Sequence, residues 1–110
     1  MAEPTLTQVF GAGATQDATK ITILKADLPG LTASANNTAE SLLVGILLKA
    51  KQQLTTANYD ANIEQGITIT TPDFNAQSLV TRSNQQYRQY TENVNFYKLD
   101  TSSALDPDDF

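Results

Sequence analysis

Hydrophobic positions recur at helical spacing between residues 37 and 57, and this is the clearest periodic pattern in the chain. Asn37 and Glu40, three positions apart, resemble a capping box, so the helix is expected to begin near Thr38. The pattern therefore predicts one main α-helix over about residues 38–57, with a core-facing stripe at Leu43, Ile46 or Leu47, Ala50, Leu54 and Ala57.

The first half of this helix is apolar around most of its circumference, because Leu42, Val44 and Leu48 lie off the predicted stripe. Strands of the same chain or a second subunit could cover the extra apolar surface, and both interpretations stay open. Gly45 in the middle of the helix favours close approach of a neighbouring backbone, since glycine weakens a helix unless packing requires it.

Alternating apolar and polar positions predict strands in four other segments. These are residues 20–24, 66–70, 76–83 and 85–99. In the last segment, Tyr90 and Phe96 share one parity while Tyr87 and Tyr97 share the other, so both faces carry aromatic rings. The order of elements predicts an α+β fold with a small antiparallel sheet or sandwich as its body.

The two ends of the chain have few apolar residues and are predicted to be extended arms. The expected organisation is an N-terminal arm over residues 1–18, a single domain over 19–99 and an acidic arm over 100–110. Phe10 is a candidate contact residue of the first arm. In the second arm, the candidate apolar anchors are Leu105 and Phe110. The candidate acidic groups, suited to a basic surface of a partner, are Asp106, Asp108 and Asp109.

Composition narrows the chemistry that is available to the chain. With no Cys and no His among its 110 residues, Cys-His and Ser-His catalysis, disulfides and imidazole or thiolate metal sites are excluded. Glu40, Glu64 and Glu92 are dispersed, and no pattern places two carboxylates across a cleft. The protein is therefore predicted not to be an enzyme and to use no cofactor.

The charge pattern bears on metal ions, nucleic acids and membranes. The net charge is −5, and the tail sequence DPDDF lacks the glycine and distal glutamate of a calcium loop, so no metal site is predicted. Seven scattered basic residues do not form a surface for phosphates, so no direct contact with nucleic acid is expected. The longest apolar stretch, LLVGILLKA, is shorter than a membrane span, and the N-terminus MAEPTLTQVF lacks the pattern of a secretion signal.

Polar but uncharged residues are expected to make up much of the surface, because Thr, Asn, Gln and Ser account for 38 of the 110 positions. Such groups form hydrogen bonds across wet protein contacts without the desolvation cost of full charges. The segment YRQY, in which Arg88 stands between Tyr87 and Tyr90, favours an aromatic cross-strand pair that supports the sheet. If the segment binds a partner, a protein is the expected one, since Tyr and Arg are enriched at interface anchors.

The chain resembles the small structural proteins of tailed bacteriophage virions and related prophage particles, particularly small proteins in phage-like gene sets of cyanobacteria. The resemblance lies in a short, cysteine-free, Thr/Asn/Gln-rich chain with the end segments MAEPTLTQVFGAGATQ and YRQYTENVNFYKLDTSSALDPDDF around a single helix. No residue takes a named role from it, because no signature motif is shared.

That resemblance implies a non-enzymatic subunit of a neck, tail or baseplate, present in multiple copies. Its partners would be copies of itself and other virion structural proteins, and its location the virion, with the host cytoplasm as the place of assembly. Two alternatives remain open. One is a capsid decoration or cement protein, and the other is a small cytoplasmic protein-binding module.

Overall fold

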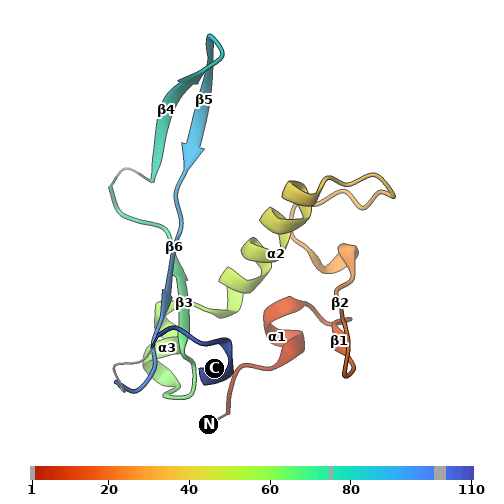
Figure 1. Cartoon of the computed structure of the whole chain (residues 1–110), viewed down its shortest axis with the longest axis vertical. Coiled ribbons are helices and arrows are strands. Elements are labelled where there is room, and N and C mark those ends of the chain that lie inside the picture. The colour runs from red at the N-terminus through yellow and green to blue at the C-terminus, as the bar shows by residue number, and fades with distance from the viewer. Residues whose placement is uncertain (1, 75, 101–103) are drawn as a thin grey trace.

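A computed structural model gives the fold and describes residues 2–74, 76–100 and 104–110. The chain is mixed α+β, with one main helix and antiparallel strand pairs, as the sequence predicts. A long β-hairpin stands away from the rest of the molecule, and both termini lie at the end opposite its tip (Figure 1). In the described residues the strands form three separate small antiparallel sheets of two strands each.

The N-terminal segment is helical where an extended arm was predicted. Helix α1 (Leu6–Phe10) begins with a capping box. The Thr5 hydroxyl accepts a hydrogen bond from the Gln8 amide at 3.2 Å, and the Gln8 side chain accepts one from the Thr5 amide at 2.9 Å. This reciprocal pair satisfies two amides that a helix start otherwise leaves open, which explains the difference.

A small strand pair follows α1. Strands β1 (Thr15–Gln16) and β2 (Ile21–Thr22) are antiparallel neighbours, and the 3₁₀ helix η1 (Lys25–Asp27) comes next. The carboxylate of Asp17 accepts hydrogen bonds from the amides of Thr19 and Lys20 at 2.8 and 3.0 Å, which closes the turn between the strands. These bonds, with that of the Thr19 hydroxyl, lower the pKa of Asp17.

The main helix is α2 (Ala39–Gln53), which begins within one residue of its predicted start. Thr38 is its N-cap, with its hydroxyl accepting from the Ser41 amide at 3.1 Å. The helix ends four residues earlier than predicted, because Leu54 leaves the helical conformation and Thr55 caps a separate helix, α3 (Thr56–Ala61). Two helices, each with its own N-cap, thus take the place of the single longer helix that the sequence predicted.

The core lies where α2 meets the next strand, β3 (Ile67–Thr70). Ala50, Leu54 and Ile69 are buried together, with Val9 of α1 and Ile67 packed against them. The predicted stripe is therefore only half correct, since Ala50 and Leu54 are buried whereas Leu43 and Leu47 are exposed. The side of α2 that carries Gly45 turns inward instead, because Leu28 packs against that glycine. A close neighbour was expected at Gly45, and one is found there, although it is the Leu28 side chain and not a backbone segment.

The remaining strands form one interrupted ribbon (Figure 1). β3 pairs with β6 (Asn93–Phe96), and β4 (Gln77–Arg82) pairs with β5 (Gln85–Tyr90). The single strand predicted over residues 85–99 is divided at Thr91 and Glu92, opposite the longer connection between β3 and β4. The pairing of the ribbon is interrupted at this division, and β4 and β5 project beyond the core (Figure 1).

The acidic tail folds back on its own chain through the 3₁₀ helix η2 (Pro107–Asp109). The Phe110 ring lies 5.9 Å from that of Phe96, in an edge-to-face arrangement, and Asp109 pairs with Lys98 at 2.7 Å. The tail residues 104–110 are thus not an arm that extends into solvent. Edge-to-face ring packing and a charge pair hold them against β6.

The molecule is open for its size. Its radius of gyration is 16.3 Å, whereas a compact domain of this length has about 13 Å. Its accessible surface is 8294 Å², compared with about 6,000 Å² for a compact monomer of this mass. About 2,300 Å² more surface therefore meets solvent than in an ordinary monomer of the same size.

Candidate functional site

Two exposed surfaces and one polar network are the features of this chain from which a function can be argued. The first surface is on α2, which carries two adjacent rows of apolar residues at i, i+4 spacing. They are largely exposed, Leu43 at 55% and Val44 at 54%. We call this surface the helix face, and its members are Leu43, Val44, Leu47 and Leu48.

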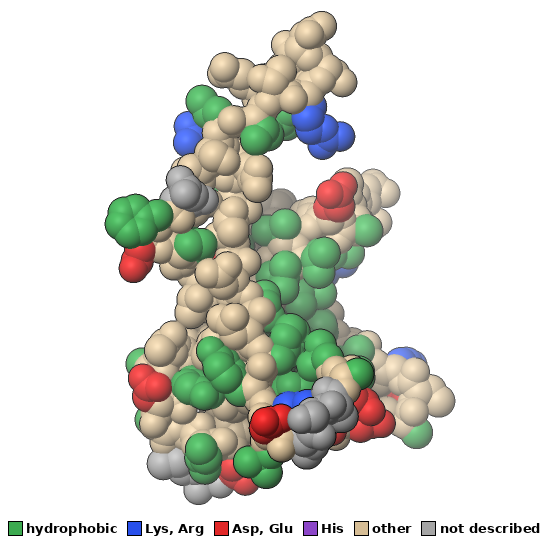
Figure 2. All heavy atoms as spheres, turned by 60° about the vertical axis from the view of Figure 1, so that its left-hand side comes forward, with side chains coloured by type: hydrophobic (Ala, Val, Ile, Leu, Met, Phe, Trp, Pro, Cys, Tyr) green, Lys and Arg blue, Asp and Glu red, His purple; other side chains and the backbone are tan. Residues whose placement is uncertain are grey.

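A shallow groove borders the helix face. It has a volume of about 280 Å³ and lies between Val44, Gly45 and Leu48 of α2 and the segment Pro29–Leu31. Figure 2 shows hydrophobic side chains gathered over the middle of the molecule, below the projecting hairpin. The interface candidates Val44 and Leu48 lie in this exposed region, whereas the third candidate on the helix, Leu42, is half-buried.

The second surface is on the β4–β5 hairpin. Because directly opposite residues of an antiparallel pair share a face, the register Leu79 to Arg88 and Gln77 to Tyr90 places these four side chains together. Leu79 is 58% exposed and Tyr90 69% exposed. The hairpin face is defined here as Leu79, Arg88 and Tyr90.

On the opposite side of the hairpin, the side chains contact one another. Val80 lies opposite Tyr87, and the Arg82 guanidinium stands 5.6 Å from the centroid of the Tyr87 ring. This cation–ring contact comes from Arg82, a residue that the sequence pattern did not single out. Tyr87 therefore supports the hairpin. On the other side Tyr90 is largely exposed, and Arg88 is exposed while donating a hydrogen bond to the Gln77 side-chain oxygen at 3.4 Å.

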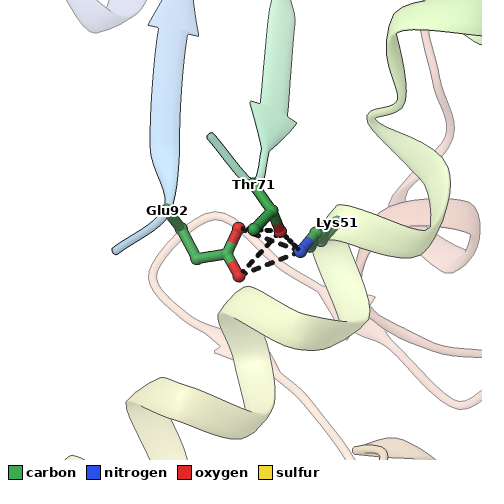
Figure 3. A network of polar contacts seen from close by, with 3 residues as sticks. All are labelled: Lys51, Thr71 and Glu92. Carbon is green, nitrogen blue, oxygen red and sulfur yellow. Dashed lines mark hydrogen bonds and ion pairs between the residues drawn. The ribbon is translucent and has the colours of Figure 1, made fainter. Parts of the chain in front are cut away.

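A polar network holds the base of the hairpin (Figure 3). The Lys51 ammonium of α2 lies 2.9 Å from both carboxylate oxygens of Glu92 and also donates to the Thr71 hydroxyl. The Thr71 hydroxyl donates in turn to Glu92 at 2.8 Å. Three segments that are far apart in the sequence thereby meet at the point where the strand pairing of the ribbon is interrupted.

This network is better suited to holding the hairpin than to catalysis. The hydrogen bond from Lys51 is the main reason that the pKa of Glu92 is lowered, and the hydroxyl of Thr71 adds to the effect. A carboxylate with a lowered pKa is a weak proton acceptor, so it would activate the Thr71 hydroxyl poorly as a nucleophile. The part of the chain that the structure describes also has no group of three acidic residues placed to hold a metal ion.

The remaining interface candidates are dispersed over the molecule. Phe10 is half-buried at the end of α1 and lines a cavity of about 320 Å³ beside Leu54 and Gly66. Tyr97 packs on the ring of Tyr59, with centroids 4.6 Å apart. Phe10 and Tyr97 therefore lie partly against other residues of the same chain.

The tail candidates also differ from one another. Asp106 caps η2 by accepting from the Asp108 amide at 2.9 Å, and Asp109 is in the ion pair with Lys98. Phe110 is 38% exposed and Leu105 62% exposed. Leu105 is thus the more exposed of the two apolar members of this group, and the apolar anchor expected at Phe110 packs mainly on its own chain.

Sequence reasoning missed three parts of the site. Leu79 was not singled out, although the two-residue turn at Ser83 and Asn84 sets a register that places it beside Arg88. Leu43 and Leu47 were assigned to the core. The Lys51–Glu92 contact has no local sequence signal, because 41 positions separate the two residues.

Comparisons of the chain with protein-family models, curated proteins and solved structures found no match. Within the described residues, no helix is long and apolar enough to cross a membrane.

Proposed function

We propose that this protein is a non-enzymatic structural subunit of a phage-type particle, a component of the neck, tail or baseplate that assembles in multiple copies. The observation that carries the proposal is the exposed surface of about 2,300 Å² beyond that of a compact monomer. Obligate interfaces bury about 2,000 to 5,000 Å² in total over both partners. The excess on one chain is therefore of the size that such an interface requires.

The kind of surface supports the same proposal. Two-stranded hairpins are at best marginally stable alone in water, so a hairpin that projects from its core is expected to gain a partner. Exposed apolar rows on a helix are likewise typical of contact sites. The resemblance to small virion proteins is the reason for proposing a phage-type particle as the assembly. The polar, weakly charged surface suits repeated protein contacts.

Quantitative mass spectrometry of purified particles from cells that express this chain tests the proposal. We expect the protein at a fixed ratio to the other particle proteins, retained through density-gradient purification. The clarified lysate before purification is the matched control for abundance. If the protein is abundant in the lysate and absent from the particles, the proposal is wrong.

A further inference from the structure

The hairpin face and the helix face are two separate surfaces that are exposed in the part of the chain that the structure describes. Leu79 and Tyr90 are more than half exposed, as are Leu43 and Val44. The Lys51–Thr71–Glu92 network fixes the base of the hairpin to the C-terminal half of α2. The hairpin is thereby held out from its own helix, and Figure 2 shows the notch between them.

We propose that the hairpin face of one copy packs on the helix face of a second copy. This inference rests on the proposed function and names the contact that would build the assembly. In this contact, Leu79 and Tyr90 cover the apolar rows of α2, and Arg88 pairs with Glu40. The hairpin thus serves as the connecting arm between subunits.

Charge favours this pairing over contacts between like surfaces. The hairpin, residues 77–90, has two of the seven basic residues and none of the twelve acidic ones. The rest of the chain has five basic and twelve acidic residues. Two hairpins placed face to face would bring like charges together, whereas a hairpin on the acidic remainder of another copy would not.

The helix face has an acidic group, Glu40, at the N-terminal end of its apolar rows. Glu40 precedes Leu43 by three positions and Val44 by four, so it lies one turn from both rows on the same side of α2. Arg88 lies directly opposite Leu79 on the hairpin face. An arginine beside an apolar residue on one surface therefore matches a glutamate beside apolar residues on the other.

The available area also fits. A standard interface buries about 800 Å² on each partner. A copy that offers its hairpin to one neighbour and its helix face to another contributes twice, about 1,600 Å² in total. The excess of about 2,300 Å² over a compact monomer accommodates both contacts.

Cross-linking tests the contact directly, because a chain without cysteine gives no background reaction. Gln86→Cys places a thiol on the hairpin face, and Ser41→Cys places one beside Glu40 at the edge of the helix face. We expect a bismaleimide to link the two variants when they are mixed, and neither variant to link to itself. Linkage of Gln86→Cys alone, or of Ser41→Cys alone, would contradict the inference, because it would show contacts between like surfaces.

A charge exchange gives an independent test. We expect Arg88→Glu and Glu40→Arg each to weaken self-association on the order of tenfold, and the chain with both changes to recover it, since each copy then supplies both reversed partners. Gln89→Glu, which places a negative charge on the other face of the same hairpin and leaves the Arg82–Tyr87 contact in place, is the control and should weaken association less than Arg88→Glu. Failure of the double variant to recover contradicts the pairing.

The result also separates this inference from the proposed function. If the unmodified chain associates but the mixed cysteine variants do not cross-link, the contact proposed here is wrong while a structural subunit remains supported. If the unmodified chain stays a monomer in isolation and is absent from particles, the proposed function itself fails.

Discussion

Lys51, Thr71 and Glu92 meet at the junction between the core and the projecting hairpin (Figure 3). The Lys51 and Glu92 side chains are about one-third exposed, and ion pairs of that kind contribute about 0 to 1 kcal/mol to stability. The network is therefore expected to set the direction of the hairpin more than the free energy of unfolding of the whole chain.

Lys51→Ala tests this role at the level of one side chain. We expect the free energy of unfolding to fall by less than about 1 kcal/mol, while the Thr91 amide, which donates to the Ala76 carbonyl at 2.7 Å, exchanges its hydrogen several-fold faster. Lys49→Ala is the matched control, because Lys49 contacts only Gln52 among the hydrogen bonds described, at 3.5 Å. Equal exchange at Thr91 in both variants would contradict the assigned role.

The same network predicts a dependence on pH. The pKa of Glu92 is lowered from its ordinary value of 4.5, so the ionised form is favoured by the fold. Its stabilising contribution is fully present above that value and is lost as pH falls through the lowered pKa. We expect Thr91 exchange, corrected for its intrinsic pH dependence, to accelerate below about pH 4.5 in the natural chain but not in Glu92→Gln.

Phe110 makes a different prediction within the tail. Its ring packs on Phe96, and a Cβ added at Gly66 would lie 3.0 Å from it, so Phe110→Ala should lower the free energy of unfolding by about 1 to 2 kcal/mol. Asp108→Asn should change it by less than about 0.5 kcal/mol, since Asp108 is exposed. Chemical denaturation of both variants measures the difference, and equal effects would show that the tail does not pack as described.

At the scale of elements, the hairpin depends on a two-residue turn. Ser83 and Asn84 both have positive φ, 49° and 61°, which is the conformation of a type I′ turn. Asparagine and glycine adopt this conformation readily, whereas serine does not. The native turn is therefore suboptimal at its first position.

Changing Ser83→Asn together with Asn84→Gly should stabilise the hairpin by about 1 kcal/mol, because both residues then suit positive φ. Asn84→Val is the opposed control and should destabilise it. Amide hydrogen exchange in β4 and β5 measures the effect, with slower exchange expected in the first variant. Unchanged exchange in both would contradict a turn of this type.

The sequence predicts the elements of this protein better than their packing. The main helix, strands β3 and β4 and the antiparallel α+β class follow from local periodicity and capping residues. The division of the last strand at Thr91 and Glu92 coincides with a contact between Glu92 and Lys51, which local patterns do not encode. The helix at Leu6–Phe10 could have been predicted from Thr5 and Gln8, which form its capping box.

The candidate site shows the same limit. An all-round apolar helix indicates that a second surface needs covering, but the pattern does not state which side turns inward. Gly45 and Ala50 face the interior because Leu28 and the core residues require small neighbours there, and this rotates Leu43 and Leu47 outward. The helix face was therefore only half predicted, by Val44 and Leu48.

At the scale of the whole molecule, the open shape is the property that needs explanation. The core described here is small, and its buried apolar side chains are Ala14, Leu28, Ala50, Leu54 and Ile69. A chain with so little buried surface gains stability when its exposed apolar groups are covered by neighbours. Assembly and folding stability are therefore expected to be coupled in this protein.

That coupling predicts a melting temperature that rises with protein concentration, because association stabilises the folded state by mass action. We expect an increase of several degrees between about 1 and 100 μM for the natural chain. Leu79→Ser with Tyr90→Ser, which changes exposed positions of the hairpin face, should remove most of the concentration dependence. A melting temperature that is independent of concentration in the natural chain would contradict the coupling.

Sedimentation velocity of the purified 110-residue chain tests the central claim most directly. A structural subunit that covers its exposed surfaces with other copies should sediment at a whole-number multiple of 11.9 kDa, with the larger species increasing as concentration rises. A single species of 11.9 kDa at every concentration would contradict the claim.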